Sequence, residues 1–333
     1  MMAGKPVHEV PSHTSVGWSS AFAHKRLCSG PVMNLGDACV YKCRYCYVPS
    51  MNYKRVYRLL DALGSDFQDV VIRRTGYKTG QTALDTLKKQ LSRGTLAKRA
   101  HDEHVCFTSS TVDPAPNAIL LEETAQAIAM IMRMTRWDVR VLSKSANLPR
   151  LAHRIVELMP GSEGRVIFGV STGTLNNALA RAMEVGTPLV SSRIASLRQL
   201  QDEGFRTFGM ICPSLPQTDY DAFSASACEA IRVERCEHVW AEPMNVRGDS
   251  TVKTIGALEG AGFNEEAAAL RAVTGKGKKA AWDDYAKATF LAHARHIPAQ
   301  KLRFLHYPTK TSLPWWKTQR TNGAVLLGAL VGH

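Results

Sequence analysis

The feature that most constrains this chain is a group of three cysteines in the stretch Gly36–Pro49, GDACVYKCRYCYVP. Cys39, Cys43 and Cys46 follow a C-x3-C-x2-C pattern, and Tyr45 stands immediately before the last cysteine. Three thiolates this close in sequence can converge on one metal centre only if the loop wraps around it. Iron–sulfur clusters are held by such local runs, usually of four cysteines, so three ligands leave one iron open to a substrate.

Two other interpretations of these cysteines are open. A zinc site could be completed by a distant ligand such as Cys28 or a histidine, or the thiols could simply be buried. Zinc sites usually repeat the C-x2-C spacing, and this stretch carries that spacing once. The pattern therefore favours an iron–sulfur cluster.

Composition sets the broad class of the chain. Its 333 residues are 45% hydrophobic and 21% charged, which is ordinary for a globular protein. No apolar run is long enough to span a bilayer, and the N-terminus lacks the apolar core of a signal peptide, so we expect a cytoplasmic protein without a membrane partner. Eight cysteines in such a chain point to metal or catalysis before disulfides. The five outside the motif are expected to be buried fillers: Cys28, Cys106, Cys212, Cys228 and Cys236.

The net charge of +13 is concentrated in two segments. Residues 51–101 carry 11 Lys/Arg against 4 Asp/Glu, and residues 275–333 carry 10 against 2. Clustered basic residues indicate a polyanionic partner, whereas a merely soluble basic surface is the simpler alternative.

Short apolar runs alternate with helical patterns along the middle of the chain. Six runs predict strands, at Pro31–Gly36, His104–Thr108, Val139–Leu142, Val166–Val170, Arg206–Cys212 and His238–Ala241. Helical spacing separates them, at Glu122–Met134, Leu148–Leu158, Ser191–Asp202 and Tyr220–Val233. Strands that alternate with helices of this length predict βαβ units and a parallel sheet.

The flanking segments are expected to differ from this repeat. Residues 1–30 have no strong period and predict an N-terminal arm, and residues 51–101 form a basic insertion with a helix at Gln81–Arg93. Residues 251–333 form a basic C-terminal extension that does not continue the repeat. Within the extension we expect a turn at Gly275–Lys279, a helix at Trp282–His296, a strand at Lys301–Tyr307 and a packed apolar end at Ala324–Val331.

The cysteine pattern resembles the C-x3-C-x-aromatic-C signature of the radical S-adenosylmethionine (SAM) superfamily. Within it, the chain looks most like the spore photoproduct lyase-like branch, over about residues 31–250. The segments that carry this narrower resemblance are Phe107–Pro114, Val141–Ser145, Met183–Glu184 with Pro188 and Arg193, Phe208–Pro216, and Glu242–Asn245.

The resemblance implies an α/β fold, a partial (β/α)6 barrel with its reactive groups at the carboxyl ends of the strands. It implies a 4Fe–4S cluster on the three cysteines, with SAM on the fourth iron and a reductant such as flavodoxin or ferredoxin. In that superfamily the aromatic residue at the position of Tyr45 lies against the adenine, and Lys144 can supply the cation for the SAM carboxylate. The remaining candidate SAM-binding residues are Ser109, Ser110, Ser171, Glu242 and Asn245. Lys144 could instead cap a strand end, Ser171 and the adjacent Thr172 could simply be polar loop residues, and Glu242 could pair with Arg247.

The residues at the hydrogen-donor positions of this chain differ from those of the spore photoproduct lyase-like branch. Spore photoproduct lyases place a cysteine at the end of the second strand and a tyrosine after the third cluster cysteine. Tyr47 fills the second of these positions, but the first aligns with Phe107, and Cys106 stands one residue earlier. Adjacent strand residues face opposite sides, so Cys106 could point away from the site, and a buried structural thiol is the favoured interpretation. The resemblance therefore does not carry thymine-dimer repair over to this chain.

These observations together predict a radical SAM enzyme that abstracts hydrogen from a substrate. The basic segments, residues 51–101 and 275–320, favour a nucleobase in DNA, and Trp315 and Trp316 could stack on a base or pack in the core. A target base inside a duplex would have to be flipped out. The alternatives are a radical SAM enzyme acting on a small molecule, a peptide or a partner protein, and a non-catalytic zinc or cluster protein that binds nucleic acid.

Overall fold

The computed structural model describes residues 6–65, 69–244, 246 and 249–330. The chain is divided into two compact units. Unit 1 comprises Met1–Lys42, Val48–Gly169 and Gln199–Arg206, and unit 2 comprises Cys43–Tyr47, Val170–Arg198 and Thr207–His333. This boundary passes through the cysteine loop, whereas the sequence suggested boundaries at residues 30 and 250.

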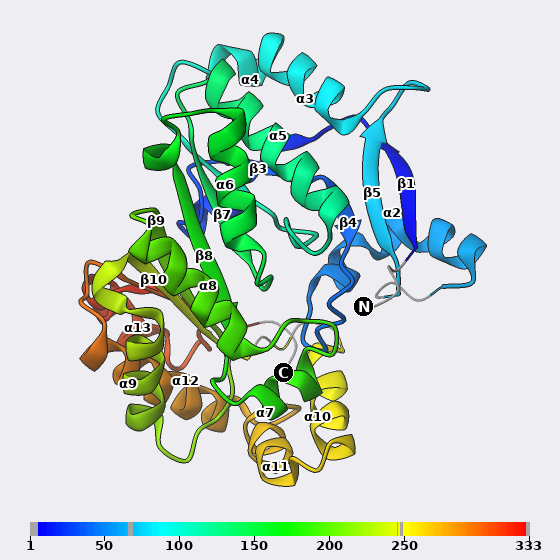
Figure 1. The fold of residues 1–333 in the computed structure, drawn as a ribbon. Coiled ribbons are helices and arrows are strands. Elements are labelled where there is room, and N and C mark those ends of the chain that lie inside the picture. The colour runs from blue at the N-terminus through cyan, green and yellow to red at the C-terminus, as the bar shows by residue number, and fades with distance from the viewer. Residues whose placement is uncertain (1–5, 66–68, 245, 247–248, 331–333) are drawn as a thin grey trace. The chain divides into compact units, whose positions relative to one another are not determined.

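Unit 1 carries two groups of paired strands (Figure 1). Its elements are β1 (Val7–Ser12), β2 (Val16–Trp18), α1 (Ser20–His24), β3 (Pro31–Met33), β4 (Gly36–Ala38), α2 (Val48–Leu63), β5 (Val71–Gly76), α3 (Ala83–Ser92), α4 (Thr95–Lys98), β6 (Val105–Thr108), α5 (Ala118–Met134), β7 (Asp138–Ser143) and α6 (Leu148–Leu158). β5 pairs in parallel with β1 and antiparallel with β4. β3, β6 and β7 are parallel neighbours, and β2 adds antiparallel to β3.

Unit 2 continues the alternation of strands and helices. Three elements cross the boundary between the units: β8 (Val166–Thr172), α8 (Val190–Asp202) and, by its first residue, β9 (Arg206–Ser214). The others are α7 (Asn177–Met183), α9 (Tyr220–Ile231), β10 (Cys236–Pro243), α10 (Ser250–Gly260), α11 (Asn264–Val273), α12 (Lys279–His296), β11 (Leu302–His306), α13 (Leu313–Thr318) and β12 (Ala324–Leu326). β9, β10, β11 and β12 follow one another as parallel neighbours.

Local sequence signals explain these elements. α6 buries Leu148, Leu151, Ala152 and Ile155, an i, i+3, i+4, i+7 stripe, and the helix lies beside α5 (Figure 1). Every residue of β8 is buried, as its unbroken apolar run predicts for a strand covered on both faces.

The predicted α/β class is confirmed, since parallel strands alternate with helices in both units. The six predicted strands and the helices between them appear close to their predicted places; Pro31–Gly36 is divided between β3 and the first residue of β4. The prediction of an irregular arm at residues 1–30 was wrong, because β1 and β2 both join sheets. The prediction that residues 251–333 leave the repeat was also wrong, because β11 and β12 extend the parallel strands beside β10.

Trp316 belongs to the core of unit 2. Its side chain is fully buried, and its ring stacks on Phe304 at 5.7 Å and lies 4.1 Å from His306, centroid to centroid. Stacking of Trp316 on a nucleobase is therefore excluded. Trp315 keeps part of its surface exposed, with the Lys287 ammonium 5.6 Å from its ring.

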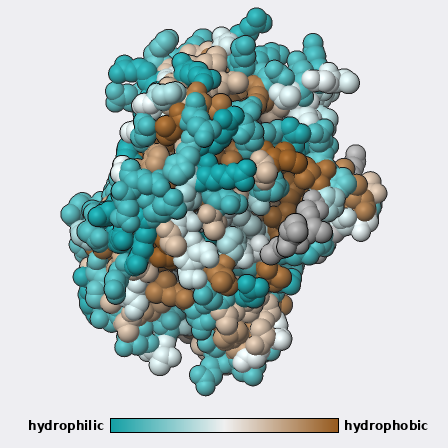
Figure 2. Space-filling view, viewed as in Figure 1, coloured by the Kyte–Doolittle hydropathy of each residue, from teal (hydrophilic) through white to brown (hydrophobic). Residues whose placement is uncertain are grey.

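The surface shows hydrophilic side chains over most of the face in Figure 2, with hydrophobic ones gathered in a few patches. Among the residues that the structure describes, no helix combines the length and apolar character needed to cross a membrane.

Candidate functional site

The cysteine loop begins directly after β4 and ends where α2 starts. All eight cysteines are free of disulfides, and Cys39, Cys43 and Cys46 are each partly exposed. Lys42 adopts the left-handed conformation, with φ of +51°, which turns the backbone just before the second cysteine. The Cys46 amide donates to the Cys43 carbonyl over 3.1 Å, which closes a tight turn around Tyr45.

An ion pair in the interior of unit 1 holds the strand that leads into this loop. Asp37 on β4 is fully buried and accepts from Arg74 on β5, at 3.0 Å from Nε and 2.5 Å from Nη2. Arg74 also donates from Nη1 to the Asn34 and Thr14 carbonyls, each at 3.2 Å. A bidentate pair with its remaining donor satisfied fixes geometry as well as charge. The residue two positions before Cys39 is thereby fixed to the neighbouring strand.

The three thiols fit a 4Fe–4S cluster by their chemistry. They are free of disulfides, partly exposed and confined to one short loop, and they supply three of the four ligands that such clusters usually take. In the described part of the chain no three His, Cys, Asp or Glu side chains lie close enough together to hold a metal ion.

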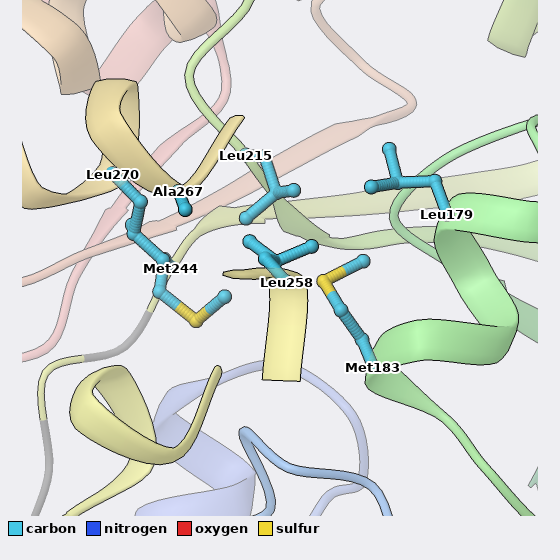
Figure 3. Packing of buried hydrophobic residues seen from close by; sticks show 7 residues of the cluster. All are labelled: Leu179, Met183, Leu215, Met244, Leu258, Ala267 and Leu270. Atoms are coloured by element: carbon cyan, nitrogen blue, oxygen red, sulfur yellow. The ribbon is translucent and has the colours of Figure 1, made fainter. Parts of the chain in front are cut away.

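Tyr45 is held by a buried carboxylate of unit 2. Its hydroxyl donates to Glu184, and the Cys43 backbone forms an antiparallel bridge with the same residue. Burial and the adjacent Glu184 carboxylate raise the pKa of Tyr45 well above its usual value. The Tyr45 ring packs against a buried cluster (Figure 3) made of Leu179, Met183, Leu215, Met244, Leu258, Ala267 and Leu270. The aromatic expected against adenine thus also anchors the loop.

Glu184 is paired in turn with Arg193, and both side chains are buried. Arg193 Nη2 lies 2.5 Å from the carboxylate, and Nη1 donates to the Ser171 carbonyl at 3.0 Å. Nε donates to the Pro188 carbonyl at 3.1 Å. Arg193 therefore ties the Glu184 segment to the carboxyl end of β8.

The same chain of contacts reaches the ends of β9 and β10. Ser171 Oγ donates to the Cys212 carbonyl at 3.1 Å, and Cys212 Sγ lies 3.5 Å from Glu242 Oε2. Unit 2 thus brings together two predicted ligands, Ser171 and Glu242, and adds a thiol that the sequence interpretation had taken for a filler. Cys212 is partly exposed, whereas the other four cysteines outside the motif are buried. The predicted ligand Asn245 lies outside the described residues.

In unit 1 the predicted ribose ligands gather around one amide. Asn34 Oδ1 accepts from Ser109 Oγ at 3.0 Å and from the Ser110 amide and hydroxyl at 2.8 and 3.1 Å. It also accepts from the Thr111 amide at 3.1 Å, while the Thr111 hydroxyl donates to the Gly36 carbonyl at 2.5 Å. Asn34 therefore organises the whole turn after β6. This residue was missed, because partners some 75 positions away leave no local signal.

Lys144 is positioned by a carboxylate from the preceding strand end. Asp113 accepts the Lys144 amide at 2.8 Å, the Ser143 hydroxyl at 2.8 Å and the Ala115 amide at 3.0 Å. Burial raises the pKa of Asp113, and these hydrogen bonds oppose the rise. The Lys144 side chain itself is partly exposed at the carboxyl end of β7.

The two candidate hydrogen donors have different surroundings. Cys106 is fully buried on β6, and burial raises its pKa far above that of a free thiol. The adjacent Phe107 is buried as well and stacks on Phe22 with centroids 5.4 Å apart. Tyr47 follows Cys46 at the start of α2 and is partly exposed. A catalytic role for either residue stays a prediction, and burial leaves Cys106 the less accessible of the two.

Comparison with known proteins rests on the fold. No protein-family profile matches the chain, and no curated protein matches it in sequence. Solved structures of spore photoproduct lyase do match: a point mutant gives a TM-score of 0.52 at 15% identity, covering 78% of this chain and 72% of that one. Spore photoproduct lyase complexed with dinucleoside spore photoproduct gives 0.50 at 16% identity, with the same coverage. A mutant with the same dinucleoside gives 0.51 at 14% identity, covering 76% and 65%. The chain therefore shares the fold of these lyases.

Proposed function

We propose that this chain is a radical SAM enzyme of the spore photoproduct lyase-like branch that acts on a nucleobase in DNA. The observation that carries the proposal is the C-x3-C-x-Tyr-C motif, which follows strand β4 in a chain that has the spore photoproduct lyase fold. The spore photoproduct lyases in the comparison bind a dinucleoside lesion, which makes a nucleobase the first substrate to test.

The chain's own residues supply binding and orientation. Cys39, Cys43 and Cys46 would hold a 4Fe–4S cluster, which with bound SAM supplies reductive cleavage to methionine and a 5′-deoxyadenosyl radical. The Lys144 ammonium offers a charge-assisted partner for the SAM carboxylate. Glu242 offers an acceptor for ribose hydroxyls or the methionine ammonium.

The nucleic-acid substrate is supported by the charge distribution. The segments 51–101 and 275–333 hold the basic excess, and the rest of the chain is slightly acidic. Phosphate contacts by such segments make binding steeply dependent on salt. The loss of Trp316 as a stacking residue removes one predicted contact and leaves the charge argument unchanged.

The deciding experiment uses anaerobically reconstituted full-length protein with SAM, dithionite and an oligonucleotide that contains deuterated thymidine. 5′-Deoxyadenosine is followed by mass spectrometry in the wild type, in Cys43→Ala and in Cys228→Ala, a matched control at a buried cysteine outside the motif. Deuterated 5′-deoxyadenosine from the wild type and the control, with none from Cys43→Ala, supports both the chemistry and the substrate.

Other outcomes separate the alternatives. If 5′-deoxyadenosine forms in a Cys43-dependent reaction but carries no deuterium, radical SAM activity is supported and thymidine is rejected as the hydrogen source. If the protein is colourless, binds zinc and lacks sulfide, the radical SAM proposal is rejected, because a cysteine zinc site contains no sulfide and has no redox chemistry. Oligonucleotide binding that does not change between 50 and 200 mM salt would reject the nucleic-acid substrate.

A further inference from the structure

Two exposed aromatic rings from different loops of unit 1 stack on each other. The ring centroids of His13 and Tyr77 lie 3.8 Å apart, with the planes inclined by 25°. Tyr77 leaves 62% of its surface exposed, and His13 is exposed as well. Aromatic rings that stabilise a fold usually bury most of their area. This pair instead presents a flat aromatic surface to solvent.

The loop that carries Tyr77 is a closed turn between β5 and α3. The Gly76 amide donates to the Gln81 carbonyl at 2.8 Å, and the Gln81 amide donates to the Lys78 carbonyl at 3.0 Å. A Cβ atom at Gly76 would lie 2.3 Å from the Gln81 Cβ, so only glycine permits this closure. Thr82 then begins α3 with a capping box to Asp85. The tip of the turn is thus held from both sides.

The loop that carries His13 is anchored as firmly. Ser12 Oγ donates to the Thr14 carbonyl at 2.9 Å, and Ser15 Oγ donates to the Ala83 carbonyl at 2.7 Å. Arg74 Nη1 holds the Thr14 carbonyl as well. With both loops fixed by their backbones, the stacked pair is already ordered, and a ligand that extends the stack would lose little entropy in ordering it.

A hollow of about 300 Å³ adjoins the pair. It is lined by the turn from Gly76 to Thr82, by Glu9 and by Arg73. Glu9 is the one carboxylate among the lining residues that the structure describes. Arg73 Nη1 lies 2.7 Å from Glu9, and Arg73 Nε also donates to Glu123 at 2.7 Å, so the two carboxylates share one guanidinium and the charge of Glu9 is partly compensated. Lys78 lines the hollow next to Tyr77 and is exposed.

We propose that the His13–Tyr77 pair is a stacking platform for an unpaired base of single-stranded DNA, with Lys78 contacting the adjacent phosphate. The proposal rests on the nucleic-acid substrate of the proposed function and deepens it. Aromatic platforms flanked by cations bind single strands in this way, because every base offers a π-face and every linkage a negative charge. Tyr77 and Lys78 lie within residues 51–101, one of the two segments where the basic excess is concentrated.

The test measures binding of full-length reconstituted protein to a fluorescein-labelled 12-residue thymidine oligonucleotide by anisotropy, and to the same strand with one 2-aminopurine. Tyr77→Ala is expected to weaken binding about 5- to 150-fold and to relieve the quenching of 2-aminopurine. Tyr77→Phe keeps the ring and should bind like the wild type. Lys78→Met should lower the salt slope by about 0.7. Ile119→Ala removes another exposed apolar side chain of unit 1 and serves as the matched control.

The possible results separate this proposal from the proposed function. If the wild type binds and quenches but Tyr77→Ala does both equally well, the platform is refuted and the DNA substrate stands. If the wild type binds no oligonucleotide at low salt, both the stacking platform and the proposed DNA substrate are refuted. Loss of binding in Tyr77→Phe as well as in Tyr77→Ala would also refute stacking, since the ring would then not be the contact.

Discussion

The contact between Tyr45 and Glu184 gives the sharpest test of how the cysteine loop is held. Tyr45→Phe removes one hydroxyl and keeps the aromatic ring of the motif. A hydrogen bond to a charged group contributes about 1.5–3 kcal/mol, because a buried charge that loses its donor is not resolvated. We therefore expect Tyr45→Phe to lower the free energy of unfolding by about that amount. Tyr77→Phe, at an exposed tyrosine, should change it by less than about 0.5 kcal/mol.

Glu184→Gln tests the other half of the contact. Arg193 is fully buried, and removal of the charge that pairs with it is expected to cost about 3–5 kcal/mol. In the Glu184→Gln variant the Tyr45 hydroxyl bonds to a neutral amide, which is worth about half as much. The double variant should therefore be more stable than the sum of the single losses predicts, by about 0.8–1.5 kcal/mol.

The assay is urea unfolding of the apo full-length chain under reducing conditions, followed by circular dichroism and tryptophan fluorescence. Coincident transitions of the two signals would justify a two-state analysis. Iron and sulfide per chain after reconstitution give a second readout, which should fall with Glu184→Gln if the anchor positions Cys43. A Tyr45→Phe protein as stable as the wild type, together with additive single losses, would refute the reasoning.

Three further predictions concern the strand ends and the core of unit 2. Asp113→Asn should destabilise the chain by about 2–3 kcal/mol, because either orientation of the amide turns its NH2 group toward a backbone amide, that of Ala115 or that of Lys144. Urea unfolding with the wild type as control checks this, and an unchanged midpoint contradicts it. Lys144→Met should raise the Kd of the reconstituted protein for SAM about 10- to 150-fold by calorimetry, and a change below threefold would reject Lys144 as the carboxylate partner. Burial lowers the pKa of His306 to about 3, so the unfolded state binds more protons between pH 6.5 and pH 3, and stability falls as the pH drops through this window. Between pH 6.5 and pH 4.5 the free energy of unfolding of the wild type should fall by about 2–3 kcal/mol more than that of His306→Phe, whose ring still packs on Trp316. Urea unfolding across this pH range checks this, and an equal fall in both proteins would show that His306 does not titrate as argued.

Much of the fold could be predicted because its signals are local. The apolar run of Val166–Thr172 and the stripe of Leu148–Leu158 each determine an element within a few residues. The pairing of β1 with β5 could not be predicted in the same way. β1 mixes polar and apolar residues, is half exposed, and meets a strand some 64 positions away, so neither periodicity nor a turn signal marks the contact.

The residues of the candidate site also differ in whether a local sequence signal marks them. Cys39, Cys43 and Cys46 form a local pattern, so the sequence alone predicts them as cluster ligands. The roles of Asn34 and Cys212 depend on which neighbours the fold supplies. A serine at a strand end can be a ligand or a donor to the scaffold, and the contacts of Ser109 and Ser110 with Asn34 depend on a residue some 75 positions away. Their predicted role as SAM ligands stays a prediction.

Three buried or half-buried carboxylates have a common role in this chain. Asp37 fixes the strand before the first motif cysteine, Asp113 holds the Lys144 amide, and Glu184 holds Tyr45. None of them needs to touch a substrate for its loss to impair activity, since each positions a residue that would. Loss of activity on mutation of such a carboxylate is thus weak grounds for a catalytic assignment. The informative comparison is with unfolding free energy and cluster content: a cysteine ligand should lose the cluster with little loss of apo stability, whereas a carboxylate anchor should lose both.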